Sequence, residues 1–236
     1  MLELERRNRL RAPFALLSVV IAATLLQACD SRDDRVAMPP DIKHIVQSTL
    51  SAQTARFSTI TTLSMNGVQA RVFSMASGII DLQSATGDLR GTLTPNPFPS
   101  PDVASESVSI EAIDVKGVAR QRALGAGQWR NVDGGLGSFL QLGNSEALFS
   151  DALNEVLQPV QSWAFVDAEP IGDVPTQHFT GVAEAPNRGA VDIWLDAKGV
   201  LRRIRLERGS LQSKTKATVV LELWDFGIAV VESLPT

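Results

Sequence analysis

Hydrophobic and polar residues alternate with the two-residue period of β-strands along much of the chain between residues 56 and 225. The clearest case is the segment 214–225, where Ala217, Val219, Leu221 and Leu223 share one face. Mostly polar residues occupy the other face of the same segment. This alternation predicts an antiparallel sheet with one covered face and one wetter face.

Turn signals separate the alternating runs. Asn66-Gly67 is a two-residue hairpin signal, and tight turns are predicted at 172–175 and 196–199. A stretch with proline at every second position, 94–102, predicts a solvated connector. Between these signals the sequence predicts strands at 56–65, 69–76, 79–83, 88–93, 107–115, 117–123, 128–132, 162–167, 176–184, 190–196, 200–208 and 214–225.

Two segments have the apolar spacing of amphipathic helices instead. The first is predicted at 42–54, with Asp41 as its N-cap. The second is predicted at 146–157, capped by Ser145 and ended by Pro159, and has a wide apolar stripe. Two helices are too few to cover both faces of a long sheet, and such sheets curl because strands twist. The predicted fold is therefore α+β: a curved antiparallel sheet, or half-open β-barrel, with helices covering the concave face.

The N-terminal segment has a different pattern. An uncharged run, Ala12–Ala28, follows a head with four arginines and ends at the only cysteine, Cys29. This order predicts a secretory signal peptide over residues 1–28. The four residues Leu26-Gln27-Ala28-Cys29 resemble the lipobox of bacterial lipoproteins, which implies a mature protein that starts at Cys29 with a lipid on the sulfur. The run of 17 residues is short for a membrane span of roughly 20 residues.

The rest of the chain is expected to form a tether and one domain. Residues 29–40 are charged, end in two prolines and predict a flexible tether, while 41–236 suffice for a single domain. Removing the charge of +2 on residues 1–28 from the chain's −4 leaves −6, which disfavours a nucleic-acid partner. The expected location is the extracytoplasmic face of the cell membrane, anchored through acylated Cys29.

No pattern in the sequence indicates catalysis. The chain has no Gly-x-Ser-x-Gly or His-Glu-x-x-His motif, and its two histidines, His44 and His178, show no triad spacing. The aspartates that follow Cys29 lack the glycine and closing glutamate of a calcium loop. With Cys29 acylated, a disulfide and thiolate catalysis are both excluded. We expect no enzyme activity, no catalytic residue, no metal site and no cofactor.

Several stretches resemble one family of bacterial lipoproteins. In 174–181, Phe179 takes the place of the tyrosine in the family's V-x-T-x-x-Y-x-G strand. Further similar stretches are 128–133, with its tryptophan, 191–199, 201–206 and 225–227. The family is that of the mycobacterial lipoproteins LppX and LprG, related in fold to the LolA and LolB lipoprotein carriers.

This resemblance implies a half-open barrel, closed by helices, that binds or carries an acylated lipid or glycolipid in a hydrophobic cavity. The implied pocket residues are Leu148, Phe149, Ala152, Leu153, Val156, Val191, Ile193, Leu195, Leu221 and Leu223, although each is also explained by core packing alone. A basic cluster, Arg202, Arg203, Arg205 and Arg208, is either a solvated face or a contact for anionic lipid headgroups. The alternative function is an envelope sensor or protein-interaction module that binds an envelope protein and carries no lipid.

Overall fold

The computed structural model describes residues 40–84, 86–98, 106–116, 118–132, 140, 142, 148–184, 189–210 and 214–230. They belong to one compact unit that spans Pro39–Thr236. The predicted signal peptide, Cys29 and the tether before Pro40 lie outside the described residues. Within the described ranges, no helix has both the length and the apolar character needed to cross a membrane.

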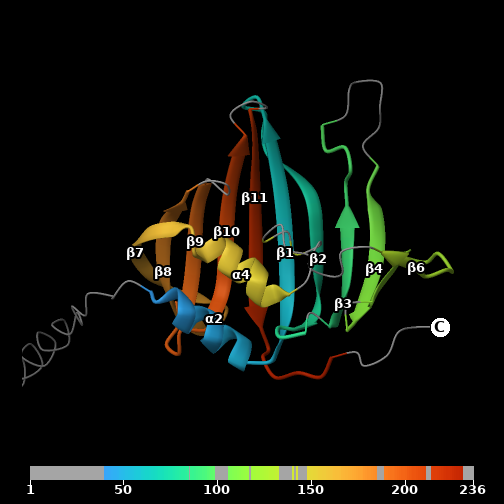
Figure 1. The fold of residues 1–236 in the computed structure, drawn as a ribbon. Helices are drawn as coiled ribbons and strands as arrows, with labels where there is room; N and C mark the ends of the chain where they lie inside the picture. Colours follow the sequence, from blue (N-terminus) through green and yellow to red (C-terminus); the bar gives the residue numbers. More distant parts are fainter. Residues whose placement is uncertain are drawn as a thin grey trace, which may run out of the picture. The chain divides into compact units, whose positions relative to one another are not determined.

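The described strands form one antiparallel sheet of eleven, in the order β6-β5-β4-β3-β2-β1-β11-β10-β9-β8-β7 (Figure 1). Two meanders, β1–β6 and β7–β11, join where the first strand pairs with the last. The sheet is curved and not closed, which confirms the predicted α+β class and its curved antiparallel sheet. The strands are β1 Thr54–Met65, β2 Arg71–Asp81, β3 Gly87–Leu93, β4 Val108–Val115, β5 Val118–Ala123, β6 Arg130–Val132, β7 Val160–Ile171, β8 Val174–Ala183, β9 Gly189–Asp196, β10 Leu201–Ser210 and β11 Thr215–Trp224.

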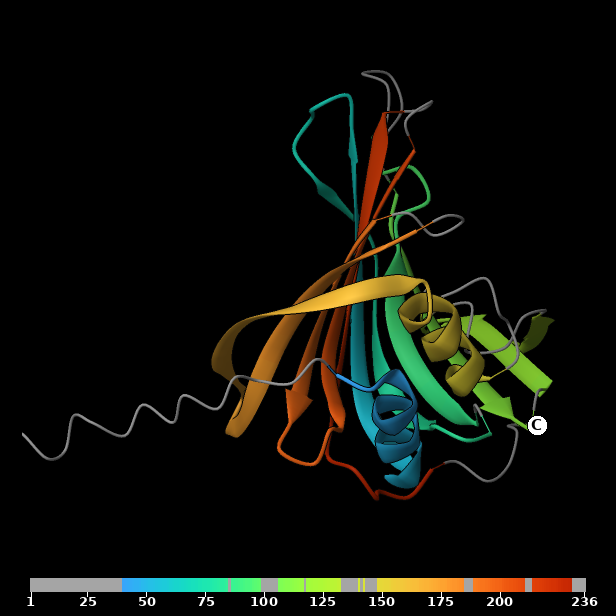
Figure 2. The same cartoon turned by 60° about the vertical axis from the view of Figure 1, so that its left-hand side comes forward.

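Two helices, α2 (Ile42–Ser51) and α4 (Phe149–Leu157), lie on one face of the sheet (Figures 1 and 2). The predicted N-cap of α2 is confirmed, because the Asp41 carboxylate accepts a hydrogen bond from the Lys43 amide at 3.0 Å. The helix packs on β10, where the buried Thr49 hydroxyl accepts a hydrogen bond from the Leu201 amide at 3.1 Å. It also contacts α4.

Both helices are shorter than the sequence predicts. Helix α2 ends at Ser51 instead of residue 54, because Gln53 has a φ of 64° and Thr54 already belongs to β1. Helix α4 begins at Phe149 instead of 146, and its N-cap is Leu148, which has extended backbone and no side-chain cap hydrogen bond. The predicted cap, Ser145, lies outside the described residues.

The predicted break between 69–76 and 79–83 is wrong, since both segments belong to the single strand β2. Gly78 lies inside this strand and pairs with Phe57 on one side and Leu89 on the other. A Cβ atom at Gly78 would lie 1.9 Å from the Asp88 carbonyl oxygen, so the glycine permits close approach of β2 and β3. The glycine therefore marks a tight strand pairing and not a turn.

The hydrophobic core lies between the helices and the sheet. We call the face that carries α2 and α4 the helix face and the opposite one the outer face. Cross-strand register places Phe57, Leu221, Ile204 and Ile193 on the helix face, and each of them is fully buried. Most outer-face neighbours on the same strands are polar or charged, as the alternation in sequence predicts, although Ile60, Val220 and Trp194 also lie on that face.

Candidate functional site

The ten residues predicted to line a lipid pocket come from α4 and from strands β9 and β11. Nine of them are 0–7% exposed, and the tenth, Leu148, is 38% exposed at the N-cap of α4. On α4 the stripe is produced by helical spacing, and on the strands it is produced by alternation. The geometry does not test whether these residues contact a ligand, so their role in binding stays a prediction.

A small hollow lies beneath α4. Val156 of α4 and Val191 of β9 line it, together with Ala183, Ala190, Leu206, Glu207 and Arg208, and its volume is about 10 Å³. This volume is at the lower limit for one water molecule.

A half-buried cation, Arg208, borders the same hollow. Its guanidinium donates a hydrogen bond to the carbonyl oxygen of Leu142, which is itself buried. Burial lowers the pKa of Arg208, and the neighbouring Glu155 carboxylate of α4 opposes that change. The interior beside α4 thus contains one positive charge.

A larger hollow lies toward the β6 edge of the sheet. It has a volume of about 490 Å³, within the range of roughly 300–1,000 Å³ that is usual for ligand pockets. Register places the side chains of Val108 and Ile110 on the helix face. Its remaining lining is Gln121, Arg122, Ala123, Ala126, Gly127, Gln128 and Arg130. This hollow combines an apolar floor with polar and cationic groups, and the sequence did not predict it.

The predicted basic cluster is largely neutralised by carboxylates. Arg202 donates to Asp196 at 2.7 Å and lies over the Phe226 ring at 4.6 Å. Arg203 lies 2.6 Å from Glu222, and Arg205 pairs with Glu207. The Arg202 and Arg203 pairs join neighbouring strands, whereas Arg205 and Glu207 lie two residues apart on β10. The cluster is therefore a set of ion pairs on the sheet and not a free basic surface.

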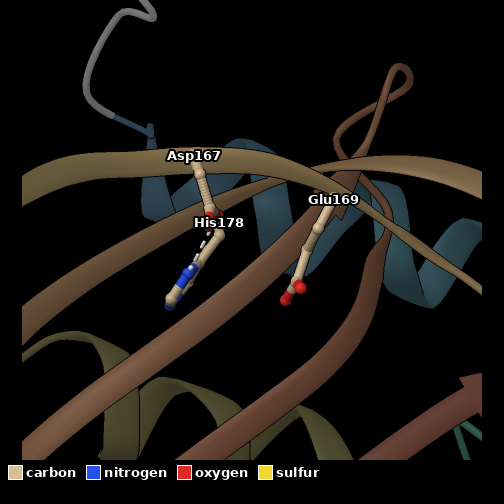
Figure 3. Close-up of side chains that lie close together, drawn as sticks. All are labelled: Asp167, Glu169 and His178. Atoms are coloured by element: carbon tan, nitrogen blue, oxygen red, sulfur yellow. Dashed lines mark hydrogen bonds and ion pairs between the residues drawn. The ribbon is translucent and has the colours of Figure 1, made fainter.

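A second polar cluster lies on the outer face of β7–β9. Figure 3 shows Asp167, Glu169 and His178, whose side chains converge from β7 and β8. The His178 ring is held between two carboxylates, with Nδ1 3.3 Å from Asp167 and Nε2 3.4 Å from Asp192. One ligand atom from each of Asp167, Glu169 and His178 lies within 4.8 Å of the other two.

Other protein groups already engage this cluster. The Trp194 indole N–H donates to Glu169, and the Trp194 ring stacks on His178 with centroids 4.1 Å apart. The Arg203 guanidinium lies 3.9 Å from Glu169 and 5.2 Å from the Trp194 ring centre. Carboxylate and imidazole are donors that bind divalent metals, but a metal here would compete with these partners. We interpret the cluster as a polar network that joins β7, β8, β9 and β10.

Sequence reasoning missed this network, although a signal for it was present. The turn between β7 and β8 pairs Ile171 with Val174, and residues at equal distances from the turn then pair in register. Counting outward from that turn brings Asp167 opposite His178 and Glu169 opposite Thr176. A strict count of the hairpin would have found the first contact.

Comparison with known proteins supports the fold. LprF from Mycobacterium bovis superposes with a TM-score of 0.50 at 13% identity, covering 84% of this chain and 99% of LprF. The chain has the fold of LprF. The predicted resemblance to the mycobacterial lipoproteins is therefore confirmed at the level of fold.

Two further solved structures are similar at low identity. LppX from Mycobacterium tuberculosis matches at 13% identity with a TM-score of 0.49, covering 81% of this chain and 98% of LppX. A LolA superfamily protein from Nitrosomonas europaea matches at 7% identity with a TM-score of 0.28, covering 79% and 95%. No protein-family model and no curated protein sequence matches the chain.

Proposed function

We propose that this protein is a non-catalytic lipoprotein of the cell envelope that binds or carries an acylated lipid on the helix face of its sheet. In this proposal the two helices cover the concave side. The observation that carries it is the hollow of about 490 Å³ beside Val108 and Ile110, on the face that also holds the apolar core. An acyl chain leaving a membrane loses about 0.8 kcal/mol per CH₂ unless another apolar surface receives it.

The resemblance in sequence to the LppX and LprG lipoproteins supports this proposal, and the fold shared with LprF agrees with it. The apolar stripe of α4 and the buried residues of β9 and β11 would continue the lipid-binding surface from the hollow toward the helices. The half-buried Arg208 would supply a cation for an anionic headgroup at the end of this surface.

Mass spectrometry of the purified domain, residues 30–236, tests the lipid. We expect an acylated lipid to co-purify with it, and we expect Ile110→Asp to remove that lipid, since Ile110 lines the hollow. Ile113→Asp is the matched control, because Ile113 is equally half-buried on the same strand but faces outward. Absence of lipid from the unmodified domain, or retention of lipid by Ile110→Asp, would contradict the proposal and favour the protein-interaction alternative.

The anchor is tested separately. We propose that Cys29 is acylated and holds the protein on the extracytoplasmic face of the membrane, because the residues before it have the order of a lipoprotein signal. In cells, labelled palmitate is expected to appear on the full chain and to be lost in Cys29→Ser, which should leave the membrane fraction. A mature N-terminus at any residue other than Cys29 would refute the anchor without affecting the lipid site.

A further inference from the structure

A second hollow lies on the outer face, away from both helices. It has a volume of about 370 Å³ and spans β1–β4. Its floor follows one cross-strand row, in which Ile60 pairs with Met75, Met75 with Thr92 and Thr92 with Ser109. Leu124 closes it at the far side, where its amide donates to the Ser109 carbonyl oxygen at 2.8 Å.

The floor is apolar and open to solvent. Ile60 is 41% exposed, Met75 46% and Leu124 53%. Farther along the same row, on β9 and β10, the outer-face positions are Asp192 and Arg205, which lie 4.0 Å apart. The outer face thus changes from charged to apolar at β11, because Val220 lies between Arg205 and Ile60 in this row. An exposed apolar patch with a polar rim is typical of a binding surface.

The rim carries charged side chains. Register places Ser77, Arg90, Glu111 and Arg122 in the adjacent cross-strand row. The Glu111 carboxylate lies 3.0 Å from Arg90 and 2.7 Å from Arg122, and the Asp88 carboxylate on the same face also attracts Arg90. Arg122 also stacks over the Trp129 ring, whereas the Arg90 side chain is 77% exposed and lines the hollow. Arg90 is therefore the cation that has donors left for a ligand.

We propose that this outer-face hollow binds the anion of a single-chain fatty acid. The acyl chain lies on Ile60, Met75 and Leu124, and the carboxylate pairs with Arg90, whose planar guanidinium matches a carboxylate. The volume is at the small end of the ligand-pocket range, which suits one chain. A stable protein interface would need about 800 Å² from each partner, more than a bounded hollow offers. This site is separate from the helix face and does not rest on the function proposed above.

Fluorescence titration of residues 30–236 with 11-(dansylamino)undecanoic acid tests the site. The double variant Ile60→Thr/Met75→Gln is expected to weaken binding about tenfold, the equivalent of losing about two methylene contacts. Arg90→Gln is expected to weaken the acid about two- to fivefold, the range of an exposed ion pair, and to leave the uncharged methyl ester unchanged. Val182→Thr is the control, because Val182 is 64% exposed on β8 outside the hollow.

The substituted side chains are solvent-exposed, so the variants should fold, and circular dichroism checks this. Unchanged probe binding in both the double variant and Arg90→Gln would overturn the proposal. Loss of binding in Ile110→Asp with no loss in the outer-face variants would assign the probe to the helix face instead. The outer-face variants could also bind anionic phospholipid vesicles more weakly than the unmodified protein and yet bind the probe equally well. That result would mean that a bilayer surface occupies the patch, and it would also overturn the fatty-acid proposal.

Discussion

Two parts of the one sheet differ in how they are packed. In the packed half, strands β8–β11, each strand contributes fully buried apolar residues to the helix face; examples are Ile193, Leu201, Ile204 and Leu221. In the hollowed half, strands β2–β5, the buried apolar strand residues are only Ile80, Leu89, Ala112 and Ala119 among those the structure describes. Among the hollows lined by described residues, one beside the packed half measures about 10 Å³, and three beside the hollowed half measure about 30, 370 and 490 Å³.

This difference separates stability from binding. Buried apolar side chains on the helix face and paired charges on the outer face hold the packed half together. The hollowed half has exposed apolar residues such as Met75 and Val108, which cost stability in water but can receive a ligand. Truncation of apolar side chains should therefore lower stability more in the packed half, and substitutions around the two large hollows should have the larger effect on ligand binding.

The largest expected effect is on a core residue of the packed half. Ile204→Ala should lower the free energy of unfolding by about 2–5 kcal/mol, because Ile204 is 0% exposed and its truncation leaves a cavity. Met75→Ala, at a residue 46% exposed in the hollowed half, should cost less than about 1 kcal/mol. Urea unfolding measures both. Equal losses would show that the two halves do not differ in packing.

The close approach of the β2 and β3 backbones at Gly78 contributes to the stability of the hollowed half, and Gly78→Ala tests this contribution. A methyl group at Gly78 would overlap the Asp88 carbonyl, so β2 and β3 must separate, at a cost of about 1–3 kcal/mol. Gly127→Ala is the matched control, because no atom lies within 4 Å of the added group. Thermal unfolding distinguishes them. A neutral Gly78→Ala would show that the strand pairing tolerates separation.

The sequence predicted the parts of the fold that depend on local patterns. Alternation in β11 identified the buried face of Val219 and Leu221, and the Asn66-Gly67 turn has the expected positive φ values of 52° and 74°. It failed where tertiary contacts override a local signal. Gly78 seemed to be a break because its close contact with β3 is not visible in the sequence. The pairing of β1 with β11 joins residues 150 to 168 positions apart, from Met65 with Thr215 to Arg56 with Trp224, which no local pattern encodes.

The sites were predicted less completely for the same reason. The apolar residues of α4 were found by their spacing, but the hollow beside Ile110 depends on the register of β4 with β5. The outer-face patch likewise requires Ile60 and Met75 to pair across β1 and β2. The carboxylate and indole groups around His178 come from the two strands on either side of it, β7 and β9, so only the hairpin contact with Asp167 was accessible to counting.

The hollowed half also contains an unfavourable charge at Asp88. Burial raises the pKa of Asp88, and the Arg90 and Arg56 guanidinium groups oppose the rise only in part. Its Oδ1 atom accepts no hydrogen bond from the described residues. The folded state therefore binds the proton more tightly, and stability falls as the pH rises above about 3.8 through the folded pKa.

Asp88→Asn removes that charge and should stabilise the protein at pH 7 by up to about 1 kcal/mol, a figure lowered by solvent screening. The gain should vanish at low pH, where Asp88 itself is neutral. Chemical unfolding at several pH values measures it. A variant that is less stable than the unmodified protein at pH 7 would show that the Arg56 and Arg90 pairs outweigh the burial.

The smallest effect is expected at Glu207, a favourable charge of the packed half. The hydrogen bond from Lys216, at 2.6 Å, is the main cause that lowers the pKa of Glu207, and Arg205 adds to it. A lowered pKa gives stability that is present above about pH 4.5 and is lost as the pH falls through the folded pKa. Because the Lys216 and Arg205 side chains are 52% and 45% exposed, Glu207→Gln should cost only about 0.3 kcal/mol at pH 7.

A double-mutant cycle with Lys216→Met isolates this contribution, since the second substitution should add little once Glu207 is neutral. The pH profile gives the sharper test of the two halves. As the pH rises, the stability of Asp88→Asn should increase relative to the unmodified protein. The stability of Glu207→Gln should decrease relative to the unmodified protein over the same range. The opposite slopes follow from burial without a partner in one half and cross-strand pairing in the other. Parallel slopes would mean that the outer-face charges of both halves have the same environment, and the contrast between the halves would then rest on the helix face alone.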